Sequence, residues 1–560
     1  MAACANSLRL VFWLRIAVFF LGAQGWAWAQ AANAPPATIP SAGYRIAGSV
    51  VNKVDGRPLA RTRITIRDAK DAKKFEWMIT ADDGRFQFSE LPAGKYSLTG
   101  TKRGFIAAGY DQHDQYSTAI VTGAGVDTES LVLRLAPDAV IAGKILDEAN
   151  DPVRHATVTL YYDDHSSGVD QIRQSRSAQT DDLGEYEFTP LRPGTYYLSA
   201  GGTPWYAVHP HSEPLAPESG RQGETVSVDR SLDVAYPVTY YPDVTEADGA
   251  MPIPIRGGER VEAEIHLTPV PSLRLIFRMP DNGKQMFPQL ELPAFDGFTS
   301  VQVTGMTRSS SPGVVELEGI PAGRYNVRMY GSGQVVQMNV VDVTRDGEEI
   351  DATKGEASSS VKFSAQMQGE TKLPEHLGVG LRSGTRMNSF SRGFDAKGEA
   401  QAQDVVAGKY EVVVWGPGKR YSVGRMSAEG AQVSGHTLSV AAGSSASVSL
   451  TVVTGDTEVQ GTVRRAGKGF AGAMVVLVPK NPEADRDLFR RDQSDLDGTF
   501  LLRGVIPGSY TLLAIENGWD LEWSQPGVIA AYSKHGRKIE LRSQGRGSIN
   551  VAEAVEVQSK

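Results

Sequence analysis

A short pattern of two glycines and a tyrosine recurs five times along the chain and constrains the fold more than any other feature. The two glycines are ten residues apart in every copy, and the tyrosine lies two residues after the second glycine. The glycine pairs are Gly84 and Gly94, Gly184 and Gly194, Gly313 and Gly323, Gly398 and Gly408, and Gly498 and Gly508. A pattern repeated with constant spacing is typical of tandem units that each fold in the same way.

Each copy predicts two turns with a strand between them. In the first copy Asp82-Asp83-Gly84 is turn chemistry, since aspartate caps its own turn and glycine accepts a positive φ. Phe86 and Phe88 alternate with polar residues, which predicts a strand with one buried face. Leu91-Pro92-Ala93-Gly94 predicts a second turn with its glycine in the left-handed conformation, and another strand starts at Tyr96. A buried tyrosine needs a partner for its hydroxyl, and we interpret the repeated tyrosines as structural.

We expect the large apolar residues of these strands to be buried and the paired glycines to lie in turns. The expected core residues are Phe86, Phe88, Tyr96, Tyr186, Phe188, Tyr196, Phe500, Leu502 and Tyr510. The fourth copy departs from the pattern, because Ala400 and Ala402 stand where the other copies have large apolar residues. Its core is the one that the pattern defines least.

Length and composition set the number of units and the fold class. A chain of 560 residues is too long for one hydrophobic core, and domains of about 100 to 150 residues suggest four or five units. The 59 glycines and 30 prolines, and the lack of a sustained helical period after the N-terminus, favour strands and turns. The predicted fold is all-β: a tandem array of about five Ig-like or prealbumin-like antiparallel β-sandwich domains.

The N-terminal residues predict export. Arg9 precedes an apolar run at 11–21, and Ala27-Trp28-Ala29 has the small-x-small pattern of a signal-peptide cleavage site. An uncleaved membrane anchor is the alternative, but the run is shorter than the roughly 20 residues that a span needs. The only cysteine is Cys4, so the mature chain would have no disulfide and each domain must rely on its own core.

The net charge of −8, without a basic stripe, argues against nucleic acid and anionic membranes as partners. The sequence therefore predicts an exported protein of the periplasm, the cell surface or the medium, with no stable membrane span after cleavage.

A strand–turn–strand element precedes three of the turn pairs. Its first copy comprises Ile46–Val50, Asp55–Leu59 and Ile64–Ile66, and related segments start at Ile141 and Val459. Together with the two turns, this order resembles the carboxypeptidase regulatory-like domain, a prealbumin-like and carbohydrate-binding-like β-sandwich. The resemblance implies an accessory, spacing or binding unit of exported bacterial proteins, and it does not imply peptidase activity.

The predicted domain organisation follows from the repeats and this resemblance. It comprises a signal peptide at 1–29, a disordered Ala/Pro-rich linker at 30–43, carboxypeptidase regulatory-like sandwiches at 44–135, 136–268 (with a long loop insertion) and 454–560, and divergent sandwiches at 269–350 and 351–453. The linkers between domains are short, which favours an extended, semi-rigid arrangement.

The sequence nominates no catalytic residue, metal ligand or cofactor site. His209-Pro210-His211 with Glu213 is the nearest approach to a zinc site, but a proline-rich loop gives these histidines no regular backbone to aim them at one metal. Asp495-x-Asp497-Gly498 begins like a calcium loop, yet Ile506 stands where the bidentate glutamate belongs. We interpret both segments as ordinary loops and turns.

Loop aromatics are the most ligand-like feature, since flat rings stack on sugars or anchor proteins. The possible ligand-contacting residues are Trp205, Tyr206, Tyr240, Tyr241, Trp519 and Trp523. Local packing of long loops is the alternative interpretation. The predicted function is a non-catalytic scaffold or binding protein of the bacterial envelope that contacts an unidentified protein or glycan through loop aromatics and sheet edges. A carbohydrate-binding module array and a metal-dependent hydrolase are the alternatives.

Overall fold

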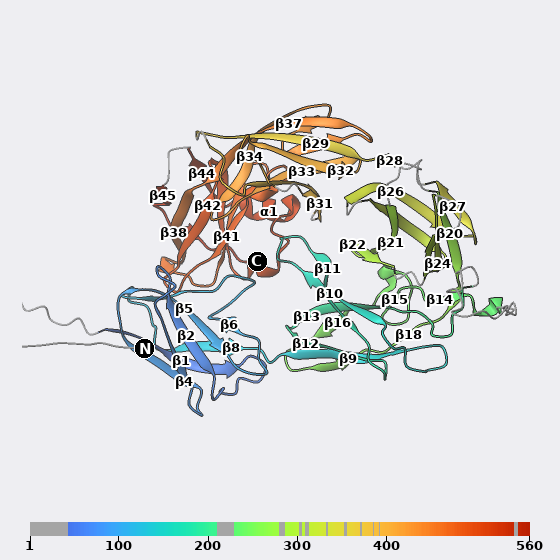
Figure 1. Ribbon diagram of the computed structural model, residues 1–560. Helices are drawn as coiled ribbons and strands as arrows, with labels where there is room; N and C mark the ends of the chain where they lie inside the picture. The colour runs from blue at the N-terminus through green and yellow to red at the C-terminus, as the bar shows by residue number, and fades with distance from the viewer. Residues whose placement is uncertain are drawn as a thin grey trace, which may run out of the picture. The chain divides into compact units, whose positions relative to one another are not determined.

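In the computed structural model, nearly all of the regular secondary structure that is described consists of strands arranged in paired β-sheets (Figure 1). The described residues are 43–560, except 210–228, 279–285, 302–304, 309–312, 332–333, 352–355, 370–371, 385, 391–392 and 543–546. Gly43–Lys560 form one compact unit. The predicted signal peptide and residues 30–42 of the predicted linker lie outside the described residues.

The first sandwich contains β1 to β8. In one sheet β1 (Tyr44–Asn52) lies between β4 (Arg85–Leu91) and β8 (Leu131–Leu135). The other sheet contains β3 (Phe75–Ile79), β2 (Arg63–Asp68), β5 (Gly94–Thr101), β6 (Ala108–Gly109) and β7 (Ile120–Thr122). Ile46, Ile64, Phe86, Phe88 and Leu98 meet between the sheets and form the core.

The second sandwich repeats this plan. Its first sheet contains β9 (Ala139–Leu146), β12 (Glu185–Leu191), β17 (Arg260–Glu262) and β18 (Ile265–His266). Its second sheet contains β10 (Thr157–Asp164), β11 (Gln171–Gln179), β13 (Gly194–Gly201), β15 (Thr239–Tyr240) and β16 (Ile253–Ile255). The short strands β14 (Val234–Ala235) and β19 (Val270–Pro271) pair beside it.

The third and fourth sandwiches, which the sequence predicts to diverge from the repeat pattern, have the same two-sheet plan. The third contains β20 (Leu273–Arg278), β23 (Gly305–Arg308), β24 (Val314–Ile320) and β27 (Glu348–Asp351), facing β21 (Met286–Ala294), β22 (Gly297–Ser300), β25 (Gly323–Gly331), β26 (Gln334–Val343) and β28 (Glu356–Ala357). The fourth contains β29 (Ser359–Met367), β32 (Glu399–Val405), β34 (Arg420–Glu429) and β37 (Ser445–Gly455), facing β30 (Gly378–Ser383), β31 (Arg386–Phe390), β33 (Gly408–Trp415), β35 (Gln432–Ser434) and β36 (Thr437–Val440).

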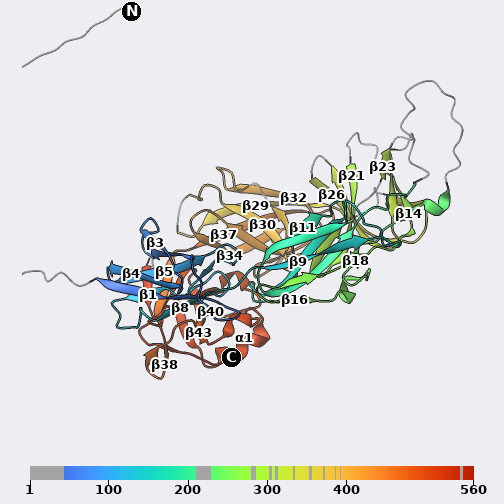
Figure 2. The same cartoon turned by 90° about the horizontal axis from the view of Figure 1, so that it is seen from below.

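The last sandwich adds a helix to the plan. One sheet contains β38 (Thr457–Arg465), β39 (Lys468–Gly469), β42 (Thr499–Val505), β45 (Gly547–Asn550) and β46 (Val555–Glu556), and the other contains β40 (Met474–Pro479), β41 (Arg490–Gln493), β43 (Gly508–Ile515) and β44 (Arg537–Leu541). Helix α1 (Pro526–Ser533) begins with a proline, whose fixed φ suits a first helical position. It lies next to β43 (Figure 2) and buries Ile529 against Trp519 and Trp523.

Among the named strands that the structure describes, pairing is antiparallel except for one type of contact that occurs in all five sandwiches. The first strand of each unit pairs in parallel with a strand from the end of that unit: β1 with β8, β9 with β17, β20 with β27, β29 with β37, and β38 with β45. This shared topology confirms a tandem array of five β-sandwiches.

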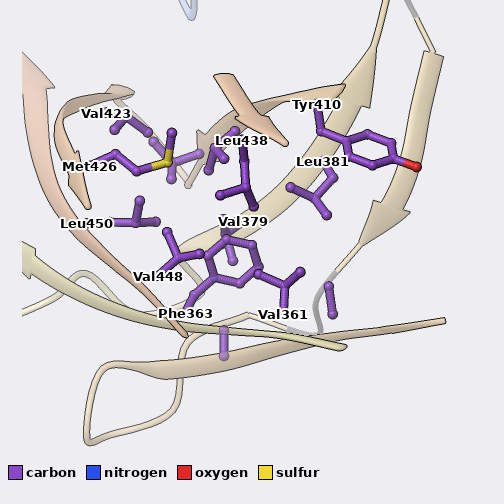
Figure 3. Packing of buried hydrophobic residues seen from close by; sticks show 14 of the residues in the cluster. Val361, Phe363, Val379, Leu381, Tyr410, Val423, Met426, Leu438, Val448 and Leu450 are labelled. Carbon is purple, nitrogen blue, oxygen red and sulfur yellow. The ribbon is translucent and has the colours of Figure 1, made fainter. Parts of the chain in front are cut away.

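The fourth core is closed despite its two alanines. Ala400 lies opposite Phe363 in the ladder between β29 and β32, whereas in the first sandwich Phe86 lies opposite Gly48. The large and small members of the pair have exchanged strands, so the space is filled in both cases. Figure 3 shows the Phe363 ring among Val361, Val379 and Val448.

The structure confirms the predicted conformation of the first glycine in each copy and corrects that of the second. All nine predicted core residues are buried, and the first glycine of each copy has a positive φ, as at Gly84 (71°) and Gly498 (83°). The second glycines start strands, and their predicted left-handed conformation is wrong. The left-handed residue lies four positions earlier in three copies, at Glu90, Gly319 and Gly504.

The second glycine lies against the ring of the tyrosine that follows it. A Cβ at Gly323 or Gly508 would lie a tight 3.3 Å from that tyrosine, whereas at Gly94 and Gly194 it would lie at ordinary contact distances of 3.7 and 3.9 Å. Each tyrosine hydroxyl donates to the carbonyl oxygen four residues before it, at distances from 2.6 Å in Tyr325 to 3.1 Å in Tyr96. The repeated tyrosine is thus a structural clamp on the preceding turn.

Candidate functional site

Trp205 is the predicted ligand-contacting residue that is most open to solvent. Its side chain is 85% exposed and packs edge-on against Tyr206, with ring centroids 5.8 Å apart. Tyr206 is anchored, because its hydroxyl donates to Glu148, which also accepts from Tyr236 at 3.3 Å. Burial and the hydrogen bond to Glu148 raise the pKa of Tyr206 to about 12. Tyr206 is therefore held in place, and the Trp205 indole that packs against it is open to solvent.

Tyr240 and Tyr241 pack against other residues of the protein. Tyr240 is buried, and its ring packs edge-on against Phe295 of the third sandwich with centroids 5.6 Å apart. Tyr241 is partly buried and packs against the core of the second sandwich. Tyr161 and Tyr197 also contact Phe295, so these rings join two sandwiches.

Trp519 and Trp523 surround Arg491 of β41. The guanidinium carbon lies 4.2 Å from the centroid of the Trp523 ring, 5.8 Å from that of Trp519 and 5.3 Å from that of Tyr116 in the first sandwich. The side chain also donates to Asp114 and to the Ser166 carbonyl of the second sandwich, at 3.3 and 3.0 Å. We call Arg491, Trp519, Trp523 and Tyr116 the Arg491 hub. It brings three sandwiches together.

The first and last sandwiches also meet in a polar contact. Lys95 Nζ lies 2.5 Å from Asp495 Oδ2, and the other carboxylate oxygen accepts from the Ala119 N–H at 3.1 Å. The Leu496 N–H donates to the Ala119 carbonyl at 3.0 Å. We call Lys95, Ala119, Asp495 and Leu496 the first–last contact. A fully extended array would separate these two sandwiches, so the extended arrangement expected from the short linkers is wrong for them.

Asp495 forms this contact because it is released from its own turn. In the second and fourth copies the equivalent residues, Asp181 and Asp395, each accept two N–H groups of their own turn. In the last copy Asp497 accepts the Thr499 N–H instead, at 3.0 Å. The carboxylate of Asp495 is therefore available to the first sandwich. Its burial raises its pKa, although Lys95 acts in the opposite direction.

A cleft of about 1200 Å³ lies beside the Arg491 hub, lined by residues from four of the sandwiches. Its cationic lining residues are Arg173, Arg382, Lys419, Arg420, Arg486, Arg490, Arg491 and Arg503. Several of them have acidic partners: Arg173 with Asp164, Arg382 with Glu411, and Lys419 with Asp456. Their charges are therefore compensated in part.

Two charged groups of the cleft are perturbed by burial, and both have structural partners. Arg490 donates to the backbone carbonyls of Asp487, Phe489 and Gly504, and its burial lowers its pKa to about 10. Burial raises the pKa of Asp492 to about 6, and this carboxylate accepts the Leu501 N–H at 2.7 Å. These bonds connect β41 to neighbouring segments of the last sandwich.

Metal ligation has no support among the described residues, where no cluster of three His, Cys, Asp or Glu side chains could hold an ion. His209 pairs with Asp233 at 3.0 Å, while His211 and Glu213 lie outside the described residues. In the calcium-like segment, Asp497 caps its own turn and Asp495 binds the first sandwich.

The sequence reasoning missed two features. The cleft could not be foreseen, because its arginines come from distant parts of the chain. The exposed stripe Phe75, Trp77 and Ile79 on β3 could have been, because these large apolar residues occupy alternate positions of a short segment in the sequence.

Several solved structures are remotely similar to the chain. The TIE protein of Bacillus anthracis is 10% identical, with 73% of each chain covered and a TM-score of 0.17. The minor pilin GBS52 of Streptococcus agalactiae is 12% identical, with 41% of this chain and 97% of the pilin covered and a TM-score of 0.20. A streptococcal ancillary pilin is 12% identical, with 55% and 98% covered and a TM-score of 0.19.

No curated protein matches the chain in sequence. No helix among the described residues is long and apolar enough to span a membrane. The family model of the carboxypeptidase regulatory-like domain matches residues 45–128 and 140–209. It does not match 454–560, where the assignment stays a prediction from the shared turn motif. The matched regions lie in the first two β-sandwiches, so it is these two sandwiches that are similar to the carboxypeptidase regulatory-like domain.

Proposed function

We propose that the protein is a non-catalytic scaffold or binding protein of the bacterial envelope, which holds five sandwiches in fixed positions and binds a protein or glycan partner. The domain limits and the export signal derived from the sequence are part of this proposal. The observation that supports it best is the Arg491 hub, because three sandwiches share one buried cation and its aromatic rings. A scaffold needs such contacts to fix the distances between its binding surfaces.

The use of perturbed groups supports a non-catalytic role. Asp492, Asp495 and Arg490 have shifted pKa values, which in an enzyme would suggest catalysis. Each of them is bonded to backbone groups or to a neighbouring sandwich. In addition, the family model that matches residues 45–128 and 140–209 is that of a regulatory-like domain and not of a peptidase.

The test is affinity capture from bacterial envelope extract with the full chain immobilised. We expect specific partners, and we expect Trp205→Ala to lose part of them because it removes the exposed indole. Leu183→Ala is the matched control, since Leu183 is also an exposed apolar residue of the second sandwich. Capture of no specific partner by the wild-type chain would contradict the proposal.

A carbohydrate-binding array is the second candidate function, favoured by the exposure of Trp205. It predicts binding to a glycan array by the full chain and a loss of that binding in Trp205→Ala but not in Leu183→Ala. Absence of binding to any glycan would exclude it.

A further inference from the structure

Strand β3 of the first sandwich has three large apolar side chains on one solvent-facing side. Phe75, Trp77 and Ile79 are 51%, 54% and 48% exposed. They alternate along the strand, so they project from the same face of the sheet. Exposed apolar edge strands invite pairing with another chain, and proteins usually protect them. This stripe therefore indicates an interaction surface.

The same three residues have backbone groups that the sheet does not use. β3 lies at the end of its sheet and pairs only with β2 in the part of the chain that the structure describes. Asp68 donates to the Lys74 carbonyl at 3.0 Å, and Thr80 donates to the Thr62 carbonyl at 2.9 Å. Hydrogen-bonded pairs alternate in an antiparallel ladder, so the N–H and C=O groups of residues 75, 77 and 79 point to the open edge.

Positive charge lies over the stripe. The guanidinium carbon of Arg63 is 4.8 Å from the centroid of the Trp77 ring, and that of Arg67 is 5.7 Å from that of Phe75. Neither arginine forms an ion pair with any residue in the described ranges. Such guanidinium groups are flat, held by the rings and free to bind carboxylates.

The charged groups around the stripe keep this surface basic. The turn between β2 and β3 contains Lys70, Lys73 and Lys74. The carboxylates of Asp68 and Asp71 accept the N–H groups of Lys70 and Lys73, at 2.7 and 3.1 Å. Glu76 alternates with the stripe residues and therefore lies on the opposite face of β3.

We propose that β3 binds an extended acidic segment of a partner protein, which adds as a further strand to the open edge and places its carboxylates against Arg63 and Arg67. This inference rests on the proposed function in taking the protein to have a macromolecular partner. Strand addition uses the backbone groups of residues 75, 77 and 79, the apolar stripe and the unpaired arginines together. A glycan would use the rings and not the backbone edge, and a second copy of β3 would bring lysines together.

The experiment measures binding of the full chain to a synthetic peptide of about nine residues, in which glutamate alternates with valine. We expect saturable binding that weakens as salt is added, and weaker binding of the matching lysine–valine peptide. Trp77→Ala should weaken binding about tenfold or more, because it removes a central aromatic contact. Arg63→Gln with Arg67→Gln should reduce the salt dependence, whereas Arg154→Gln, an exposed arginine of the second sandwich, should not.

The backbone is tested separately. A glutamate–valine peptide with N-methyl groups along one edge keeps its charge but cannot donate to a strand, and we expect its binding to be lost. Trp77→Pro removes the outward N–H of an edge position, where proline is tolerated, and should bind more weakly than Trp77→Ala. Thermal unfolding checks that each variant is folded.

Equal binding of the N-methylated and unmodified peptides would overturn the proposal, as would equal binding of the lysine peptide. Sedimentation that shows a dimer abolished by Trp77→Ala, or a glycan-array signal lost in that variant, would also overturn it by assigning the stripe to another occupant. Envelope partners captured equally by wild type and Trp77→Ala would overturn this inference alone. Peptide binding without any captured partner would contradict the proposed function and leave the edge site in place.

Discussion

Lys95 of the first sandwich donates a hydrogen bond to Asp495 of the last, with 2.5 Å between Nζ and Oδ2, although 400 residues separate them in the chain. The two side chains are 34% and 14% exposed, so solvent screens the pair only in part. The bond connects a strand of the first sandwich to a turn of the last. The N–H of Ala119, which also belongs to the first sandwich, donates to the other oxygen of the same carboxylate.

Removing this carboxylate should loosen the contact between the two sandwiches. We expect Asp495→Ala to lower the free energy of unfolding by about 1 to 3 kcal/mol. The loss of a fully buried ion pair would lower it more, but Lys95 is partly hydrated. Hydrogen exchange should accelerate at the Ala119 and Leu496 amides. In the control Asp181→Ala the loss should be confined to the second sandwich, because that aspartate caps only its own turn. Unchanged exchange at Ala119 in Asp495→Ala would contradict the contact.

Asp492 should make the last sandwich less stable at high pH. Burial raises its folded pKa to about 6, above the unfolded value, so its ionisation opposes folding. This penalty is present above the folded pKa and disappears as the pH falls from about 7 to about 4. We expect Asp492→Asn to be more stable than wild type at pH 8, by up to roughly 3 kcal/mol, with no difference at pH 4.

The comparison should be made by urea unfolding or by hydrogen exchange of β41 and β42 at both pH values. The difference between wild type and variant isolates Asp492 from the turn aspartates whose pKa is lowered, such as Asp395. A difference that is equal at pH 8 and pH 4 would show that Asp492 does not titrate in this way.

The repeated tyrosine should contribute through its hydroxyl. Tyr325→Phe removes the donor to the Pro321 carbonyl and leaves that oxygen without this bond. We expect a loss of about 1 to 2 kcal/mol, measured by thermal unfolding. Tyr532→Phe, in helix α1, is the control and should change stability little. An equally small change in both variants would show that the tyrosine hydroxyl does not stabilise the turn.

The exchanged pair of the fourth sandwich should behave as a coupled unit. Phe363→Ala should cost about 3 to 5 kcal/mol through the cavity it leaves, and Ala400→Phe alone should strain the core. Because the two residues lie opposite each other, the double variant should recover part of the combined loss. Additive losses in denaturant unfolding would mean that the two positions do not share the same space.

How far the fold was predictable is seen in single elements. Phe86 and Phe88 were assigned to a buried strand face because a period of two is a local property of the sequence. The positive φ of the first glycine was also predictable, because turn chemistry is likewise a local property of the sequence. The conformation of Gly94 was not predictable in this way, because the turn before it is closed by the Tyr96 hydroxyl, which reaches back to the Pro92 carbonyl.

The candidate site was less predictable. Trp205, Trp519 and Tyr240 all read as loop aromatics, yet Trp205 is exposed and the other two are buried between segments. Exposure depends on which surfaces meet, and local patterns hold no information about that. The stripe on β3 was visible as an alternation, but its use as an open edge depends on the order of strands in the sheet.

By itself, the sequence determined that this protein is a string of β-sandwiches, because turn chemistry and apolar alternation act over a few residues. Only the tertiary structure decided that Asp495 binds the first sandwich while Asp181 caps its own turn. The two local sequences differ in one relevant place, because Asp497 takes the Thr499 N–H where the second copy has Leu183, and this frees Asp495 without choosing its partner. The physical reason is that the partner, the Ala119 N–H, becomes available only once the first and last sandwiches have packed together.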